Sequence, residues 1–197
     1  MPLTDERLVS RLRARDEAAF DELVLRYQQK VLNLVYRLLG NREEARDIAQ
    51  EVFVTVFKSV DTFRGESKFS TWLFRIAANH CKNRIKYLSR RDFHRASPLD
   101  DEADRLSGES SDGPAIFLQA RVERPDKVYE GMQIQAALRR ALEELDEDHR
   151  TLVVLRDVEN LSYLEICEIT KLPEGTVKSR LHRARMALKE RIDKYTK

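Results

Sequence analysis

Residues 161–185 read LSYLEICEITKLPEGTVKSRLHRAR, and this stretch decides the fold class. Ser162 and Glu165 have the spacing of a capping box, which predicts a short helix from Tyr163 to Thr170. After the tripeptide KLP, apolar spacing predicts a longer helix from about Glu174 to Tyr195. A short helix, a tight turn and a second helix are the parts of a helix-turn-helix, so this end of the chain is expected to be α-helical.

The N-terminal half also has the apolar spacing of helices. One helix is expected from about Asp16 to Leu39, with Asp16 as its N-cap and Gly40 as its stop. Asn41 begins a second helix, with Glu44 three residues on as a capping-box partner. After a turn at residues 61–68, a third helix is expected over about 70–90, and its inward-facing residues are Trp72, Leu73, Ile76, Ala77 and Tyr87.

A stretch rich in Ser, Pro and Gly separates two helical units. Residues 96–130 carry nine acidic and four basic residues and are expected to form an extended, flexible acidic linker. Two helices are then expected, at about 133–144 and 147–158. The predicted fold is therefore all-α, with small helical domains at residues 1–95 and 131–197 joined by the linker.

Opposite charges cancel along the chain. Of 197 residues, 36 are Lys or Arg and 34 are Asp or Glu, which leaves a net charge of +2. Residues 63–95 carry +7 and residues 171–197 carry +6, while the segments 96–130 and 131–170 carry −5 each. The near-neutral total is therefore compatible with two separate nucleic-acid-binding surfaces.

Several functional classes are excluded. The longest apolar runs are about four residues, whereas a membrane helix needs about 20, so we expect no membrane insertion. Cys81 and Cys167 cannot form a disulfide framework or a four-ligand zinc site, and we expect both to be small buried side chains in a reducing cytosol. The sequence has no glycine-rich phosphate loop, nucleophile elbow or metal-spaced His/Cys set, so we expect no enzyme, cofactor or metal site.

The last helix has a basic polar face. From residue 171 to the end there are nine basic and three acidic residues. Lys178 and Arg183 can donate to guanine, and Ser179 can reach a base or a phosphate. Arg180 and Arg185 suit phosphates, which position the protein without specifying sequence. The alternative is a solvated basic face on a terminal helix.

Residues 63–75 read FRGESKFSTWLFR and interleave aromatic with basic side chains. Aromatic rings stack on unpaired bases while cations hold the backbone, a combination typical of single-strand binding. A loop pocket at residues 67–69 can then read a flipped base. The alternative is that Phe69, Trp72 and Phe74 belong to the core.

The polar side of the second helix has a different character. Asp47, Gln50 and Glu51 gather there, and nothing in the pattern resembles a nucleic-acid contact. Two interpretations stay open, a solvated charged face and a face that docks on another protein.

Two blocks of sequence carry a family resemblance. Residues 46–53 (RDIAQEVF), 63–65 (FRG) and 71–77 (TWLFRIA) look like conserved region 2 of bacterial sigma factors. Residues 161–166 (LSYLEI) and 173–185 (PEGTVKSRLHRAR) look like region 4. With two such blocks and a short linker, the chain resembles the extracytoplasmic-function group of the sigma-70 family and is similar to envelope-stress sigma factors.

The resemblance implies a cytoplasmic, non-enzymatic factor that directs core RNA polymerase to promoters. Its implied partners are the β′ clamp helices and the β subunit of the polymerase, promoter DNA and an anti-sigma factor. The residues that match the β′-docking region are Asp47, Gln50 and Glu51. Those that match the reader of the melted −10 element are Ser67, Lys68, Phe69, Arg75, Asn79, Asn83 and Arg84. Those that match the reader of the duplex −35 element are Lys178, Ser179, Arg180, His182, Arg183 and Arg185.

There are departures from the family pattern. His182 stands where an aromatic or aliphatic residue is common, and Cys167 stands where a small alanine-like residue is usual. Two other functions compete with the sigma-factor interpretation. A free-standing helix-turn-helix regulator, bound to duplex DNA as a dimer, does not need the 63–75 cluster. An enzyme that acts on nucleic acid needs a catalytic constellation that the sequence does not offer.

Overall fold

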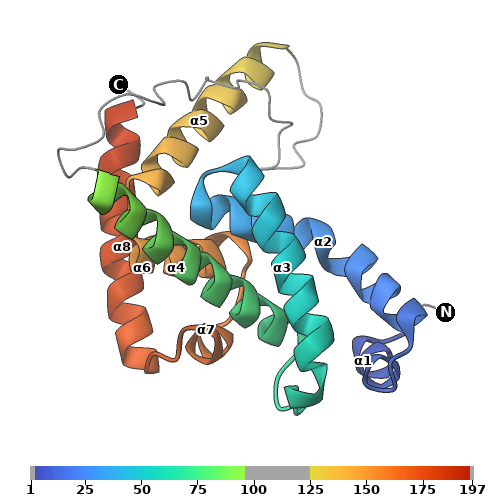
Figure 1. The fold of residues 1–197 in the computed structure, drawn as a ribbon. Coiled ribbons are helices and arrows are strands. Elements are labelled where there is room, and N and C mark those ends of the chain that lie inside the picture. Colours follow the sequence, from blue (N-terminus) through green and yellow to red (C-terminus); the bar gives the residue numbers. More distant parts are fainter. Residues whose placement is uncertain (1–2, 96–124, 196–197) are drawn as a thin grey trace.

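The computed structural model describes residues 3–95 and 125–195, and over these residues the chain is α-helical without strands, as predicted (Figure 1). We call residues 3–95 the N-terminal unit and residues 125–195 the C-terminal unit. The N-terminal unit consists of α1 (Asp5–Arg13), α2 (Glu17–Leu39), α3 (Arg42–Ser59), the 3-10 turn η1 (Val60–Thr62) and α4 (Phe69–Arg95). The C-terminal unit consists of α5 (Pro125–Glu143), α6 (Glu147–Val153), the π-helical turn η2 (Val154–Val158), α7 (Tyr163–Thr170) and α8 (Glu174–Tyr195).

Most of the predicted helix ends are confirmed by their caps. The Asp16 side chain accepts from the backbone N–H of Ala19, and Gly40 ends α2 with a left-handed φ of 75°. At α7, Ser162 and Glu165 form the predicted capping box, in which the Ser162 N–H donates to the Glu165 carboxylate at 2.8 Å. These local signals fix where α2 and α7 begin.

Two predictions about the extent of the helices need correction. Helix α1 was not predicted, although Leu8, Val9 and Leu12 bury one of its faces. Helix α5 begins at Pro125, inside the expected linker, because Pro is well suited to the first helical position. The predicted linker residues 96–124 lie outside the described part of the chain.

Two predictions about single side chains were also wrong. Asn41 caps α3 by accepting from the N–H groups of Glu43 and Glu44, but the Glu44 carboxylate turns to the Arg84 guanidinium instead of returning to Asn41. Tyr87 is 56% exposed. It follows the buried Cys81 by six residues, about 240° around the helix, which places it on the solvent side of α4.

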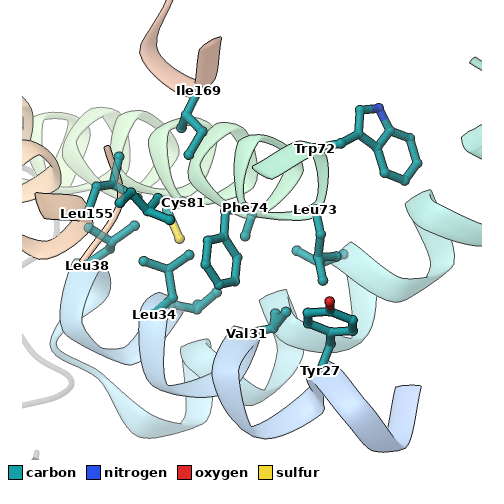
Figure 2. Packing of buried hydrophobic residues seen from close by; sticks show 14 of the residues in the cluster. Tyr27, Val31, Leu34, Leu38, Trp72, Leu73, Phe74, Cys81, Leu155 and Ile169 are labelled. Carbon is teal, nitrogen blue, oxygen red and sulfur yellow. The ribbon is translucent and has the colours of Figure 1, made fainter. Parts of the chain in front are cut away.

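The apolar core is continuous between the two units. Helix α4 lies between α3 and the C-terminal helices (Figure 1). Figure 2 shows Leu34 and Leu38 of α2 and Cys81 of α4 packed near Leu155 of η2 and Ile169 of α7. Cys81 is buried as predicted, whereas Cys167 is only partly buried. The units are therefore packed on each other in this structure.

None of the helices in residues 3–95 and 125–195 combines the length and apolar character needed to span a bilayer.

Candidate nucleic-acid and polymerase interfaces

An acidic polar face runs along α3. Asp47, Gln50 and Glu51 are all exposed, and their spacing places them on one side of the helix. Val54, one turn further on, is 51% exposed and extends this face with an apolar side chain. The His80 ring of α4 lies at one edge of the face, where its Nδ1 is 3.3 Å from the Glu51 carboxylate. The face thus combines carboxylates with one exposed apolar side chain.

The turn between η1 and α4, which we call the 63–69 turn, is anchored by aromatic side chains. Phe63 and Phe69 are 7% and 4% exposed, and their ring centroids lie 6.0 Å apart. Trp72 lies 5.3 Å from Phe63, and the Tyr27 ring lies 5.4 Å from Phe69. Phe74 is buried too, so these aromatic residues belong to the core in this structure. The core interpretation also holds for Phe69, and the turn presents mainly polar groups.

A hollow of about 170 Å³ lies between α1 and the 63–69 turn. Phe63 and Phe69 contribute its apolar wall. Its polar lining comes from Glu6, Ser10 and Arg13 of α1 and from Arg64 and Ser67 of the turn. Gly65 has a φ of 74°, so the turn itself requires the left-handed conformation there. Because α1 supplies one side, this hollow was not visible in the sequence pattern.

The predicted residues of α4 form a stripe. Arg75, Asn79 and Asn83 follow one another at intervals of four, and the two asparagines are exposed. Arg84 is set apart from this stripe, because its guanidinium donates to Glu44 of α3 at 2.9 Å. The hydrogen bond from Arg84 lowers the pKa of the Glu44 carboxyl.

Lys68 of the turn contacts the C-terminal unit. Its Nζ lies 2.9 Å from the Glu165 carboxylate of α7, at the start of the helix-turn-helix. Burial by itself raises the pKa of the Glu165 carboxyl, but hydrogen bonds from Ser162 and Lys68 outweigh it and hold that pKa at about 2. The carboxylate is therefore charged at any pH near neutrality.

Helix α8 presents the predicted basic face. Val177, Leu181 and Ala184 bury the opposite side of the helix. The exposed residues include Lys178, Ser179, His182, Arg183 and Arg185, while Arg180 is partly buried.

Two arginines of α8 are held by carboxylates of the preceding helices. Arg180 pairs with Asp148 of α6 at 3.1 Å, and Arg185 donates to Asp157 of η2 at 3.0 Å. These pairs fix the directions of the two guanidinium groups along the helix-turn-helix.

The predicted residues thus form three separate surfaces, on α3, on the 63–69 turn with α4, and on α8. Within the described ranges, no three His, Cys, Asp or Glu side chains gather as metal ligands would.

Comparison with known proteins identifies the arrangement. Residues 23–91 match the model of Sigma-70 region 2, and residues 135–188 match that of Sigma-70 region 4. The chain is 38% identical over 184 residues to the RNA polymerase sigma-H factor of Pseudomonas aeruginosa, covering 93% of this chain and 91% of that protein. The chain belongs to the sigma-70 family, in its extracytoplasmic-function group. As a sigma factor it is a non-enzymatic factor of transcription initiation.

Other relatives agree with this assignment. The ECF RNA polymerase sigma-E factor of Escherichia coli K12 is 36% identical over 190 residues, which cover 96% of this sigma factor and 95% of the relative. Among solved structures, CnrH in complex with the cytosolic domain of CnrY has the same fold, with a TM-score of 0.63, 23% identity and coverage of 96% and 97% of the two chains. The sigma factor RpoE of Bartonella quintana, in complex with the anti-sigma factor NepR, matches with a TM-score of 0.64, 20% identity and coverage of 88% and 96%.

Proposed function

We propose that this sigma factor directs core RNA polymerase to promoters by reading two elements in different states. Helix α8 reads the −35 element as duplex, and the 63–69 turn with α4 reads the −10 element as an unpaired strand. The observation that carries the proposal is that two basic, polar surfaces lie on separate units while the exposed acidic face lies on α3. Docking on polymerase then brings both readers to one promoter, where linkage raises their effective concentration.

At the −35 element, Lys178, Ser179, His182 and Arg183 are the proposed base readers, because they are exposed on α8. Arg180 and Arg185 are the proposed phosphate contacts. In the free protein these two arginines pair with Asp148 and Asp157, and a DNA phosphate can take the place of either carboxylate.

At the −10 element, we propose that an unpaired base enters the hollow beside Ser67, and that Lys68, Arg75, Asn79, Asn83 and Arg84 hold the strand that follows. Phe69 supports the turn from within, since its ring is buried. Amide side chains such as that of Asn79 can both donate and accept, which suits contact with a base edge.

We propose that Asp47, Gln50 and Glu51 dock on the clamp helices of the β′ subunit, that α8 and its neighbours approach the β subunit, and that the protein works in the cytoplasm. We also propose regulation by an anti-sigma factor, the kind of partner named for the RpoE of Bartonella quintana.

Transcription with purified core polymerase tests the proposal. Run-off transcription on genomic DNA fragments is expected to start at specific sites only when this chain is added. Asp47→Ala/Glu51→Ala is expected to weaken core binding at least tenfold with unchanged helicity, whereas the exposed acidic pair of α2, Glu17→Ala/Asp21→Ala, serves as the matched control. Sequence-specific binding of duplex DNA by the chain alone, as a dimer without effect on polymerase, would instead support the free-standing regulator.

A further inference from the structure

Two arginines at the end of α1 hold the segment that leads into the 63–69 turn. Arg15 donates to the Phe57 carbonyl and to the Asp61 carboxylate, each at 2.9 Å. Its guanidinium carbon lies 5.4 Å from the centre of the Phe57 ring. Arg13 donates to the carbonyl of Phe63, the first residue of the turn. The α1–α2 connection thus contacts the end of α3, η1 and the start of the turn.

Backbone carbonyls near the end of a helix need hydrogen-bond donors from outside that helix. The last carbonyls of a helix have no partner within that helix, and the end of the helix carries partial negative charge. A guanidinium satisfies such carbonyls and offsets that charge. Arg15 does this for the Phe57 carbonyl, near the end of α3. Arg13 donates to the carbonyl of Phe63, which lies beyond η1 in an extended conformation.

The backbone of Arg15 is itself unusual. Its φ is 62°, in the left-handed region that is unfavourable for a residue other than glycine. In this conformation its N–H donates to the Leu12 carbonyl and ends α1, while the side chain points to α3. The ion pair with Asp61 is roughly half exposed on both sides, so it adds little to stability. The contacts of Arg15 therefore contribute more to the position of the 57–63 segment than to the stability of the fold.

We propose that Arg13 and Arg15 are positioning residues for the 63–69 turn, which set its geometry for reading an unpaired strand. This inference rests on the proposed function of that turn. Arg13 acts through the Phe63 carbonyl, and Arg15 acts through Phe57 and Asp61. Because Arg13 also lines the hollow beside Ser67, its position fixes one wall of the proposed base pocket.

The test uses holoenzyme assembled from the full chain and core polymerase. The probe is a single-stranded oligonucleotide that carries the −10 element of a promoter located by the run-off assay. Arg13→Ala and Arg15→Ala are each expected to weaken strand binding about tenfold, the loss of a charge-assisted hydrogen bond, and to reduce discrimination against base-substituted probes. Core affinity is expected to stay within about twofold. Arg11→Ala, at an exposed arginine of α1 that pairs with Asp16, is the matched control.

Asp61→Ala separates positioning from direct contact with DNA. This variant removes a negative charge, so simple attraction between protein and DNA predicts tighter strand binding. It also removes the acceptor of the Arg15 hydrogen bond, so positioning through Arg15 predicts weaker binding, in the same direction as Arg15→Ala. Tighter binding by Asp61→Ala, together with weaker binding by Arg15→Ala, would overturn the inference, because Arg15 would then be a phosphate contact.

Arg15→Gly keeps the test valid if the alanine variant fails to fold, because glycine accepts a φ of 62° without strain. Amide hydrogen exchange in the 63–69 turn of this variant is expected to rise selectively. An unchanged exchange rate with unchanged strand binding overturns the inference alone. A wild-type holoenzyme that does not bind the strand at all overturns the proposed function as well, so the two failures are distinguishable.

Discussion

Removing the Glu159 carboxylate is expected to loosen the contact between the two units. Glu159 follows η2, and its side chain accepts from the Arg37 guanidinium of α2 at 2.8 Å. The two side chains are only 14% and 8% exposed. Burial raises the pKa of the Glu159 carboxyl and lowers the pKa of Arg37, so the loss of water outweighs their mutual attraction. Such a pair adds little net stability, but removing one partner leaves a buried charge.

The magnitude follows from that asymmetry. Breaking a buried pair costs about 3–5 kcal/mol. Since the pair joins α2 to the C-terminal unit, its loss destabilises the closed arrangement, in which the units are packed together, relative to an open one. A loss of about 3 kcal/mol raises the open population about a hundredfold. Glu159→Ala is therefore expected to open the units about a hundredfold more often, before either unit unfolds.

Cys81 reports this opening directly. It is 2% exposed at the contact between the units, and burial raises the pKa of its thiol to about 12 (Figure 2). In a Cys167→Ser background, the rate of thiol labelling at Cys81 is expected to rise about a hundredfold with Glu159→Ala. Glu22→Ala, which removes a more exposed carboxylate from its pair with Arg26, is the control and should change the rate little.

The double variant Arg37→Met/Glu159→Leu tests whether the opening comes from the charge that Glu159→Ala leaves behind. It removes both charges and keeps apolar volume, so labelling should return close to the wild-type rate. If Glu159→Ala leaves the Cys81 rate unchanged, or if the double variant opens as readily as the single one, the argument from the loss of the buried Glu159 carboxylate is refuted.

Three further predictions concern the C-terminal unit. Ser162→Ala removes the N-cap of α7 and is expected to cost about 1 kcal/mol in urea unfolding, whereas a change within error contradicts the capping argument. The pKa of Glu165 is held at about 2, below its ordinary value of 4.5, so this carboxyl adds stability above pH 4.5 that is lost as the pH falls towards 2. Glu165→Gln is therefore expected to flatten the acid-side loss of stability in that window, and an unchanged slope speaks against it. Leu155→Ala removes a fully buried side chain at the contact between the units and should cost about 2–5 kcal/mol by thermal or urea unfolding, a loss that Leu164→Ala, 69% exposed on α7, should not share.

The sequence predicted those features that depend on neighbouring residues. The caps of α2 and α7 rest on residues within one helical turn, such as Asp16 and Ser162, and they are confirmed. The bond between Glu44 and Arg84 joins residues forty positions apart, and it displaced a capping box that local spacing predicted. Helix α1 was not predicted because its apolar face is short and interrupted by charges. Without α1, neither the roles of Arg13 and Arg15 nor the hollow beside the 63–69 turn could be predicted.

The acidic and basic segments that alternate along the sequence also contact each other in the folded protein. Asp148 of the acidic segment lies 3.1 Å from Arg180 of α8 and 3.9 Å from Lys82 of α4, and Glu165 lies 2.9 Å from Lys68. Carboxylates of residues 131–170 therefore face both basic surfaces. Because exposed ion pairs contribute about 0–1 kcal/mol each, phosphates can replace the exposed carboxylate of Asp148 at little cost.

The Arg37–Glu159 pair and the apolar contact around Cys81 are different, since both are buried where DNA cannot replace them. When an arginine or lysine side chain exchanges its carboxylate partner for a DNA phosphate, this buried contact stays unchanged. The free energy that holds the units together therefore resides in the buried contact of α2 and α4 with η2 and α7. The surface pairs govern how strongly salt affects each basic surface. Raising the salt concentration should accordingly weaken the surface pairs without raising the labelling rate of Cys81.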